Sequence, residues 1–191
     1  MQFLPVLLIL GTVACFAPVP VKPVAAGSAA DLPVITGSGY TGVIFPKERL
    51  EGTEHYWGFK TSEYWTPSRE VIDKLESRLR EALDRGQKTP EVLDPSAEGN
   101  PQRKAYLRRE ISKILEHLGS YRRQYVGIVA PDGTRRVLVN CFPGPGVDPP
   151  DFYRDWRQQI VLVLDGGFMY WRIQYDVSND LYTAFDSNGY A

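Results

Sequence analysis

Residues 159–175 read QIVLVLDGGFMYWRIQY, and this stretch decides how the rest of the chain is interpreted. Two runs rich in β-branched and aromatic residues, 160–164 and 168–175, flank Asp165-Gly166-Gly167. Asp-Gly and Gly-Gly favour the tight turns of two-residue hairpins. The stretch therefore predicts a β-hairpin. Because an isolated hairpin is only marginally stable in water, it also predicts further strands and a covering layer.

More strands are predicted on both sides of this hairpin. Residues 121–130 and 135–142 flank the turn sequence PDGT at 131–134, which is typical of a second hairpin. A short strand at 181–185 follows a turn at 178–180. Successive strands joined by tight turns are antiparallel, so the C-terminal half is predicted to be a five-stranded meander.

Alternation along these strands assigns side chains to two faces. In the strand at 135–142 one face carries Val137, Val139 and Cys141, and the other carries Leu138, Asn140 and Phe142. In the strand at 168–175 one face carries Met169, Trp171, Ile173 and Tyr175, and the other carries Phe168, Tyr170, Arg172 and Gln174. Both faces hold bulky apolar groups, so we expect both to be partly covered.

Two amphipathic helices precede the strands. Thr66-Pro67 and Asn100-Pro101 are helix-start signals, and Gly86 and Gly119 are helix-stop signals. Apolar residues recur at helical spacing between them, namely Ile72, Leu75, Leu79 and Leu83 in the first helix and Leu107, Ile111, Ile114, Leu115 and Leu118 in the second. Such stripes need an apolar partner, and the sheet supplies one.

The predicted fold class is therefore α+β, with two amphipathic helices packed on a four- to five-stranded antiparallel meander sheet. The aromatic segment from Tyr40 to Trp65, which also contains Tyr56 and Trp57, is too rich in rings for a disordered tail. We expect it to cap part of the sheet face opposite the helices. The alternative is an aromatic platform for a ligand.

The first forty residues are predicted to lie outside the domain. Residues 3–17 are apolar and too short to span a bilayer, which is typical of the hydrophobic region of a signal peptide. The predicted organisation is a leader at 1–26, a Pro-, Ala- and Gly-rich tether at 27–39, and a single α+β domain at 40–191. An alternative to cleavage is lipidation at Cys15, because residues 12–15 (TVAC) partly match a bacterial lipobox.

Charge argues against some classes of partner. The chain has 191 residues and a formal net charge of −1, so nothing predicts binding to nucleic acid, and a membrane is expected only through an anchor at Cys15. The second helix and the following turn are locally basic, with Arg103, Lys104, Arg108, Arg109, Lys113, Arg122 and Arg123 against Glu110 and Glu116. This patch could attract an anion or could complement the acidic C-terminal part of the same domain.

Few residues suggest catalysis. Cys141 with His55 or His117 could form a thiol nucleophile and base, but a cysteine in the middle of an apolar strand is usually an inert core residue. Two histidines and one thiol at distant positions make a poor zinc site. Asp176, Ser178 and Asp180 alternate as in a calcium loop, yet they lack its glycine and distal glutamate. No cofactor is predicted.

Several polar residues lie inside the predicted strands. Cross-strand pairing is the simplest explanation for them. If they converge on one face, they could form a shallow polar binding site, for which the candidates are Arg122, Tyr125, Asn140, Tyr170 and Arg172.

The sequence also resembles known proteins in part. The run YRRQYVGI at 121–128, with Val139-Asn140, Asp165-Gly166-Gly167 and the terminal NGYA at 188–191, resembles a group of small exported bacterial proteins of unassigned activity. The resemblance implies a secreted or lipid-anchored domain. More loosely, the order of helices and strands is similar to the cystatin-like α+β fold, and QYVG at 124–127 comes one residue short of the cystatin Gln-x-Val-x-Gly loop.

These observations favour one hypothesis over two others. The leading hypothesis is an exported, non-catalytic domain with a binding or structural role in the periplasm or cell envelope, with an unknown partner. The first alternative is a thiol-dependent hydrolase that uses Cys141. The second is a binder of small ligands or anions on the sheet face opposite the helices.

Overall fold

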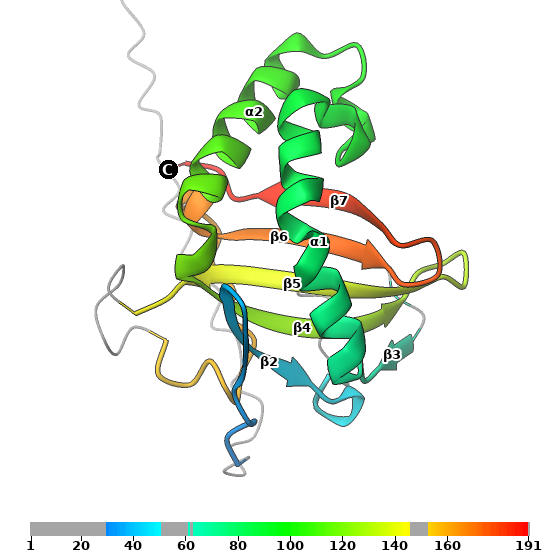
Figure 1. The fold of residues 1–191 in the computed structure, drawn as a ribbon, viewed down its shortest axis with the longest axis vertical. Coiled ribbons are helices and arrows are strands. Elements are labelled where there is room, and N and C mark those ends of the chain that lie inside the picture. The colour runs from blue at the N-terminus through cyan, green and yellow to red at the C-terminus, as the bar shows by residue number, and fades with distance from the viewer. Residues whose placement is uncertain (1–29, 51–60, 62, 146–152, 191) are drawn as a thin grey trace, which may run out of the picture.

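The computed structural model describes residues 30–50, 61, 63–145 and 153–190, in which two long helices cover one face of a β-sheet (Figure 1). The helices are α1 (Arg69–Lys88) and α2 (Pro101–Glu116). The strands are β1 (Ile35–Gly37), β2 (Tyr40–Phe45), β3 (Glu63–Trp65), β4 (Tyr121–Val129), β5 (Arg135–Pro143), β6 (Trp171–Asp176) and β7 (Leu181–Ser187). Short 3₁₀ turns lie at Lys47–Arg49 (η1), Pro90–Val92 (η3), Pro95–Ala97 (η4), Leu118–Ser120 (η5) and Gly167–Met169 (η6). The predicted α+β class is confirmed, with seven strands among the described residues instead of four or five.

The sheet has the strand order β1-β2-β4-β5-β6-β7. β2 runs parallel to the first half of β4, and β3 pairs antiparallel with its last three residues, so the two share one edge of β4. The other pairs are antiparallel. β4 to β7 form an antiparallel meander as predicted, but without the predicted strand at 160–164, and the parallel pair that brings β2 into the sheet was not predicted.

The predicted hairpin at 159–175 does not form. Residues 160–164 are not a strand, and β6 pairs instead with β5 and β7. Gly166 and Gly167 have φ angles of 92° and 56°, and they lead the chain into η6 instead of a two-residue hairpin turn. As a result, residues 160–164 pass over the sheet without joining its backbone hydrogen bonds.

Both helices begin with side-chain caps. Asn100 Oδ1 accepts a hydrogen bond from the Arg103 amide at 3.0 Å, as predicted, whereas the first helix is capped by Ser68, two residues later than the predicted Thr66 start. α1 also continues through Gly86 to Lys88, so the predicted stop is wrong. Gly86 is buried against the side chain of Leu93 in the following loop. A glycine here lets that loop approach the helix closely.

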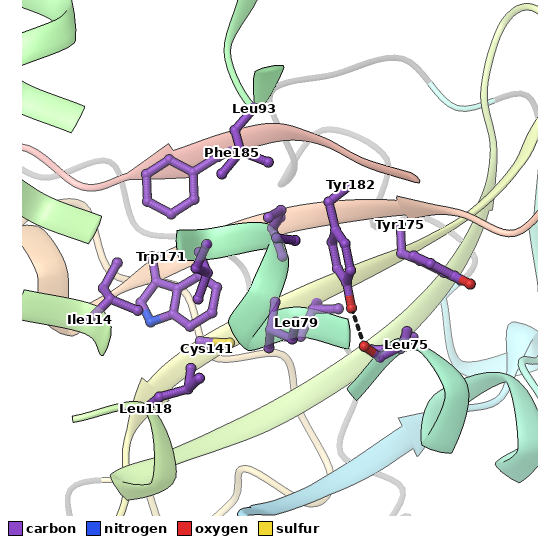
Figure 2. Close-up of a cluster of buried hydrophobic side chains, with 14 of the residues drawn as sticks. Leu75, Leu79, Leu93, Ile114, Leu118, Cys141, Trp171, Tyr175, Tyr182 and Phe185 are labelled. Carbon is purple, nitrogen blue, oxygen red and sulfur yellow. Dashed lines mark hydrogen bonds between the residues drawn. The ribbon is translucent and has the colours of Figure 1, made fainter. Parts of the chain in front are cut away.

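The main core lies between the helices and the sheet (Figure 2). Leu75 and Leu79 of α1 and Ile114 of α2 lie over Trp171 of β6 and Cys141 of β5. The side chains predicted to share this face, Val137, Val139, Cys141, Trp171, Ile173 and Tyr175, are all buried in it. The predicted faces are confirmed for β5 and for residues 171–175. Met169 and Phe168 lie in η6, and Phe168, predicted on the opposite face, packs against this core.

A second, smaller core covers the opposite face. Phe45 of β2 and Tyr64 of β3 pack there with Phe142. They belong to strands of the sheet, so this part of the aromatic segment widens the sheet and does not cap it, and Tyr40 and Trp65 pack on the helix side. Trp156 adds a cover from the segment that follows residue 152. Residues 51–60, with His55, Tyr56 and Trp57, lie outside the described part of the chain.

The ordered domain begins earlier than the predicted boundary at residue 40. β1 pairs with β2, and Leu32 is buried, with its amide donating to the Arg157 carbonyl at 3.0 Å. Asp31 forms an ion pair of 2.9 Å with Arg157. Part of the predicted tether therefore packs on the domain. The leader and Cys15 lie outside the described residues, and within those residues no helix is long and apolar enough to cross a membrane.

The close contact at Gly86 gives a first test of the fold. A Cβ atom at this position would lie 2.2 Å from Leu93 Cδ1, so Gly86→Ala should destabilise the domain by about 1–3 kcal/mol, although alanine is the better helix former. The free energy of unfolding in urea measures the effect. Arg85→Ala, at the exposed neighbouring position, should change it by less than about 0.5 kcal/mol. A stabilised Gly86→Ala variant would contradict the packing described here.

Candidate functional site

β4 carries polar side chains on both of its faces, and this separates the predicted site residues. Arg123 and Tyr125 are buried on the helix side. Gln124 is buried on the opposite side, where Arg122 also lies, with its guanidinium 5.2 Å from the centre of the Trp156 ring. Tyr125 is therefore on the other face of the sheet from the remaining four candidates. The five residues do not form one site.

On the helix side, Tyr125 belongs to a buried charged cluster. Arg123 Nε lies 3.0 Å from Glu76 Oε1, and the Tyr125 hydroxyl donates to the same oxygen at 2.8 Å. Arg123 also donates to the carbonyls of Tyr121 and Leu118, at 3.1 and 3.0 Å. The cluster joins α1 to β4 and is closed off from solvent. Glu76 points from α1 into the core.

Burial controls the ionisation of this cluster. It raises the pKa of Glu76, an effect that the Arg123 charge and the Tyr125 hydrogen bond oppose. Cys141 lies opposite Arg123 in the β4–β5 register, and burial raises the pKa of its thiol far above the ordinary value. A buried thiol in this state supplies almost no thiolate nucleophile.

The proposed histidine partners of Cys141 do not complete a dyad. The ring of His117 stacks on Phe168, with 6.2 Å between the ring centres, and His117 itself caps the end of α2. His55 lies outside the described residues. Nothing in the described part of the chain therefore supports the thiol-dependent hydrolase.

On the opposite face, two buried carboxamides organise the chain. Gln124 Nε2 donates to the carbonyls of Trp156 and Gln159, each at 2.7 Å, while Gln124 Oε1 accepts from the Val161 amide at 2.9 Å and from Asn140 Nδ2 at 3.0 Å. Asn140 Nδ2 also donates to the Val161 carbonyl at 2.9 Å. The polar residues expected to bind a ligand are thus used to hold another part of the same chain.

A third carboxamide continues this pattern. Asn188 Nδ2 donates to the carbonyls of Val163 and Asp165, at 2.6 and 3.0 Å. Side-chain amides therefore bind the carbonyls of residues 161, 163 and 165. The carbonyls of 161 and 163 have the spacing with which a neighbouring strand would bind a chain, whereas one Asn188 Nδ2 reaches both 163 and 165 because the chain bends at Leu164. Three side chains replace the backbone partner that residues 160–165 lack.

The remaining candidates are also engaged. Tyr170 and Tyr153 share a hydrogen bond between their hydroxyls, and Arg172 forms an ion pair of 2.8 Å with Asp186. The hollow beside Asn140, Tyr170 and Arg172 has a volume of about 10 Å³, which is room for a single water molecule. This hollow is too small for a small-molecule ligand.

The predicted basic patch does not form a cluster of available cations. Arg123 is buried with Glu76, and Arg122 lies on the other face. Arg103 pairs with Asp94 at 2.7 Å, Lys104 pairs with Glu91 at 2.6 Å, and Arg109 pairs with the buried Glu110 at 2.9 Å. These four basic residues pair with acidic residues at 76–110, so the expected complement from the acidic C-terminal part is not what the ion pairs show. Lys113 instead lies over the rings of Phe168 and Tyr190.

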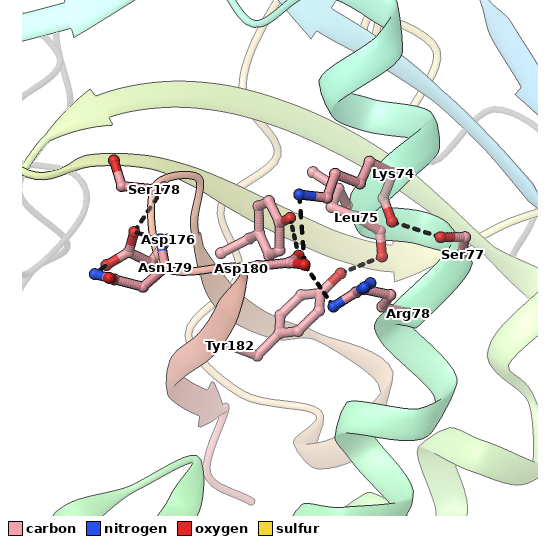
Figure 3. A network of polar contacts seen from close by, with 10 residues as sticks. Lys74, Leu75, Ser77, Arg78, Asp176, Ser178, Asn179, Asp180 and Tyr182 are labelled. Carbon is pink, nitrogen blue, oxygen red and sulfur yellow. Dashed lines mark hydrogen bonds and ion pairs between the residues drawn. The ribbon is translucent and has the colours of Figure 1, made fainter.

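The acidic turn at 176–180 is likewise satisfied from within (Figure 3). Asp176 Oδ1 accepts from the amides of Ser178 and Asn179, both at 2.9 Å. Asp180 accepts from the Tyr175 hydroxyl and pairs with Arg78 at 2.5 Å and Lys74 at 3.4 Å. It joins the β6–β7 turn to α1. Among the described residues, no group of three or more His, Cys, Asp or Glu side chains could hold a metal ion.

Searches among family models, curated proteins and solved structures found no match to this chain. They therefore add nothing to the resemblance to exported bacterial proteins, and the cystatin-like arrangement stays a prediction.

Sequence reasoning missed two of the residues that matter most here. Gln124 was visible as a polar residue inside a strand, but its position among apolar neighbours was not used to infer a buried partner. Asn188 follows the last strand and was assigned to the chain end. A buried carboxamide needs several hydrogen bonds, and that need was the available signal. The partners at 161 and 163 could not be inferred because residues 160–164 were assigned to a strand.

Removing the Gln124 carboxamide should loosen this part of the chain. Gln124→Met keeps the length of the side chain but leaves two carbonyls and one backbone amide without partners, so the free energy of unfolding should fall by about 3 kcal/mol. Hydrogen exchange at the Val161 amide should accelerate. Gln158→Met removes a single exposed hydrogen bond to Asp31 and should cost less than about 0.5 kcal/mol. Equal effects would refute the anchoring role.

Asp180 should make the stability depend on acid pH. The Tyr175 hydrogen bond, helped by Arg78 and Lys74, lowers the pKa of its carboxyl below the ordinary value of 3.8. Its ionised form therefore stabilises the fold above about pH 4, and this contribution is lost as the pH falls through the lower folded pKa. Asp180→Asn, which suits the positive φ of 58°, should reduce the loss of stability between pH 5 and pH 2. Urea unfolding at each pH checks this, with the exposed Asp165→Asn as a control that should keep the wild-type dependence.

Proposed function

We propose that this chain is an exported, non-catalytic domain of the cell envelope that binds an extended strand of a protein partner. Export is supported by the leader-like composition of residues 1–26. The non-catalytic part is supported by the burial of Cys141 and by the use of the strand carboxamides as internal anchors.

One observation carries the binding role, and it is the segment Ile160–Leu164. Its inner carbonyls, at Val161 and Val163, are held by side chains of the domain. Within the described residues, the backbone groups of Leu162 and Leu164 form no hydrogen bond, and these side chains are 41% and 95% exposed. An exposed apolar run with unpaired backbone groups is the feature to which a further strand adds.

Other edges of the sheet are less suited to this role. The outer side of β7 is interrupted where the Phe185 amide donates to the Leu93 carbonyl at 3.0 Å and where Ala184 takes a φ of 52°. β1 at the other edge has three residues. Natural edge strands are protected by such irregularities and by short length. Residues 160–164 are uncharged and carry no such protection.

In-cell crosslinking tests the proposal. A photoreactive amino acid at position 164 should give a discrete crosslinked protein in the periplasmic or envelope fraction, because Leu164 is the most exposed large apolar residue of the described chain. The same amino acid at Val92, which is 38% exposed on η3, is the matched control and should give none.

The protein recovered from the crosslinking experiment also tests export. The mass of the recovered chain should show either an acylated N-terminus at Cys15 or a start near Asp31. A chain that keeps Met1 and stays inside the cell would overturn the envelope assignment. Equal crosslinking at positions 164 and 92, or none at 164, would overturn the binding role.

A further inference from the structure

The segment Ile160–Leu164 presents its backbone in a way that specifies what it can pair with. In an extended chain, the N–H and C=O of one residue point to the same side, and the sides alternate from residue to residue. Asn140 and Asn188 hold the carbonyls of Val161 and Val163, and Gln124 holds the Val161 amide, all on the inner side. The N–H and C=O groups of Leu162, which lies between the two anchored residues, are thereby directed to the outer side, and the chain bends at Leu164.

The charges around the segment limit the choice of partner. Residues 159–164 are uncharged, Asp165 follows them, and Arg157 is already paired with Asp31. A partner strand that matches this edge should be apolar over about five residues and should not place a carboxylate opposite Asp165. A second copy of the same segment, running in the opposite direction, meets both requirements.

We propose that two copies of this chain form a symmetric dimer by antiparallel pairing of residues 160–164, centred on Leu162. This inference rests on the proposed binding role and names its partner. In this register Leu162 lies opposite Leu162, and Ile160 lies opposite Leu164. The two Leu162 residues can exchange two hydrogen bonds, and Ile160 with Leu164 can add further bonds on either side as far as the bend at Leu164. Asp165 lies opposite Gln159, which avoids a like-charge pair.

The pairing also satisfies the rule for closed dimers. A two-fold axis uses the same patch on both subunits, and a strand that pairs with itself in antiparallel register is such a patch. The contact buries Leu162 and Leu164, which are otherwise the exposed side chains of the segment. The pairing covers the unpaired side of the segment in both copies, so the dimer leaves this side closed to further copies.

The two-fold position of Leu162 allows a charge-swap experiment. In the purified full-length protein, sedimentation should show a dimer for the wild type. Leu162→Asp places two carboxylates opposite each other, and Leu162→Lys places two ammonium groups there, so each should weaken dimerisation by about tenfold or more. An equimolar mixture of the two variants should restore the dimer as a heterodimer. Leu162 is 41% exposed, so neither change should alter the melting temperature much.

Control variants separate this contact from others. Val92→Asp, at an exposed apolar residue on η3, should leave the dimer unchanged. Leu181→Asp lies at the start of β7, and a dimer lost in Leu181→Asp but kept in Leu162→Asp would place the contact on that edge and overturn the proposal. Failure of the mixed variants to pair, or open-ended aggregates of the wild type, would overturn it as well.

Two outcomes distinguish this inference from the proposed function. If the wild type is monomeric while the crosslink from position 164 joins a different protein, the second copy is the wrong partner but the binding role stands. If the wild type is monomeric and position 164 gives no crosslink, both proposals fail.

Discussion

The buried carboxamide of Gln124 is the contact on which the C-terminal half of the structure depends. A carboxamide enclosed by apolar side chains must have its hydrogen bonds satisfied, because each one lost costs the desolvation of a polar group. Gln124 meets this requirement with the backbone of residues 156–161 and with Asn140. The partners fix where that segment crosses the sheet. The path of the segment in turn fixes which of its backbone groups face outward.

β4 carries buried polar side chains on both of its faces, and each of them needs partners for its hydrogen bonds. Toward the helices, Arg123 and Tyr125 meet Glu76 of α1. On the other face, Gln124 forms hydrogen bonds with backbone groups of residues 156–161, which are not a helix or a strand. The two solutions have different consequences. The charged cluster joins regular elements and is sealed inside the core, whereas the carboxamides hold a segment whose outer side stays in contact with solvent.

Most of the fold, but not the segment after residue 152, could be predicted from the sequence. Helical spacing located α1 and α2, and alternation assigned Val139 and Cys141 to the helix-covered face, because burial of one face leaves a local pattern.

The strand assigned to 160–164 followed from the same kind of pattern and was wrong. Strand propensity records that side chains suit a pleated, half-buried surface, and residues 160–164 do lie on one. It does not say whether the hydrogen bonds come from a backbone or from carboxamides 20 to 40 residues away. The candidate site was harder to predict. Tyr125 and Asn140 are polar residues of adjacent strands, but their side chains lie on opposite faces of the sheet.

The unpaired outer side of residues 160–164 has a physical explanation in the way the segment is held. A run of five aliphatic residues is expected to enter a sheet beside the strand that follows it. β6 pairs with β5 on one side and β7 on the other, so no edge of β6 remains for the residues that precede it. Gly166 and Gly167 then turn the chain away. The segment can be held only from the sheet face, by side chains that reach one side of its backbone. Among the described residues, the opposite side of the segment forms no backbone hydrogen bond at Leu162 or Leu164, and this is the observation behind the proposed strand pairing.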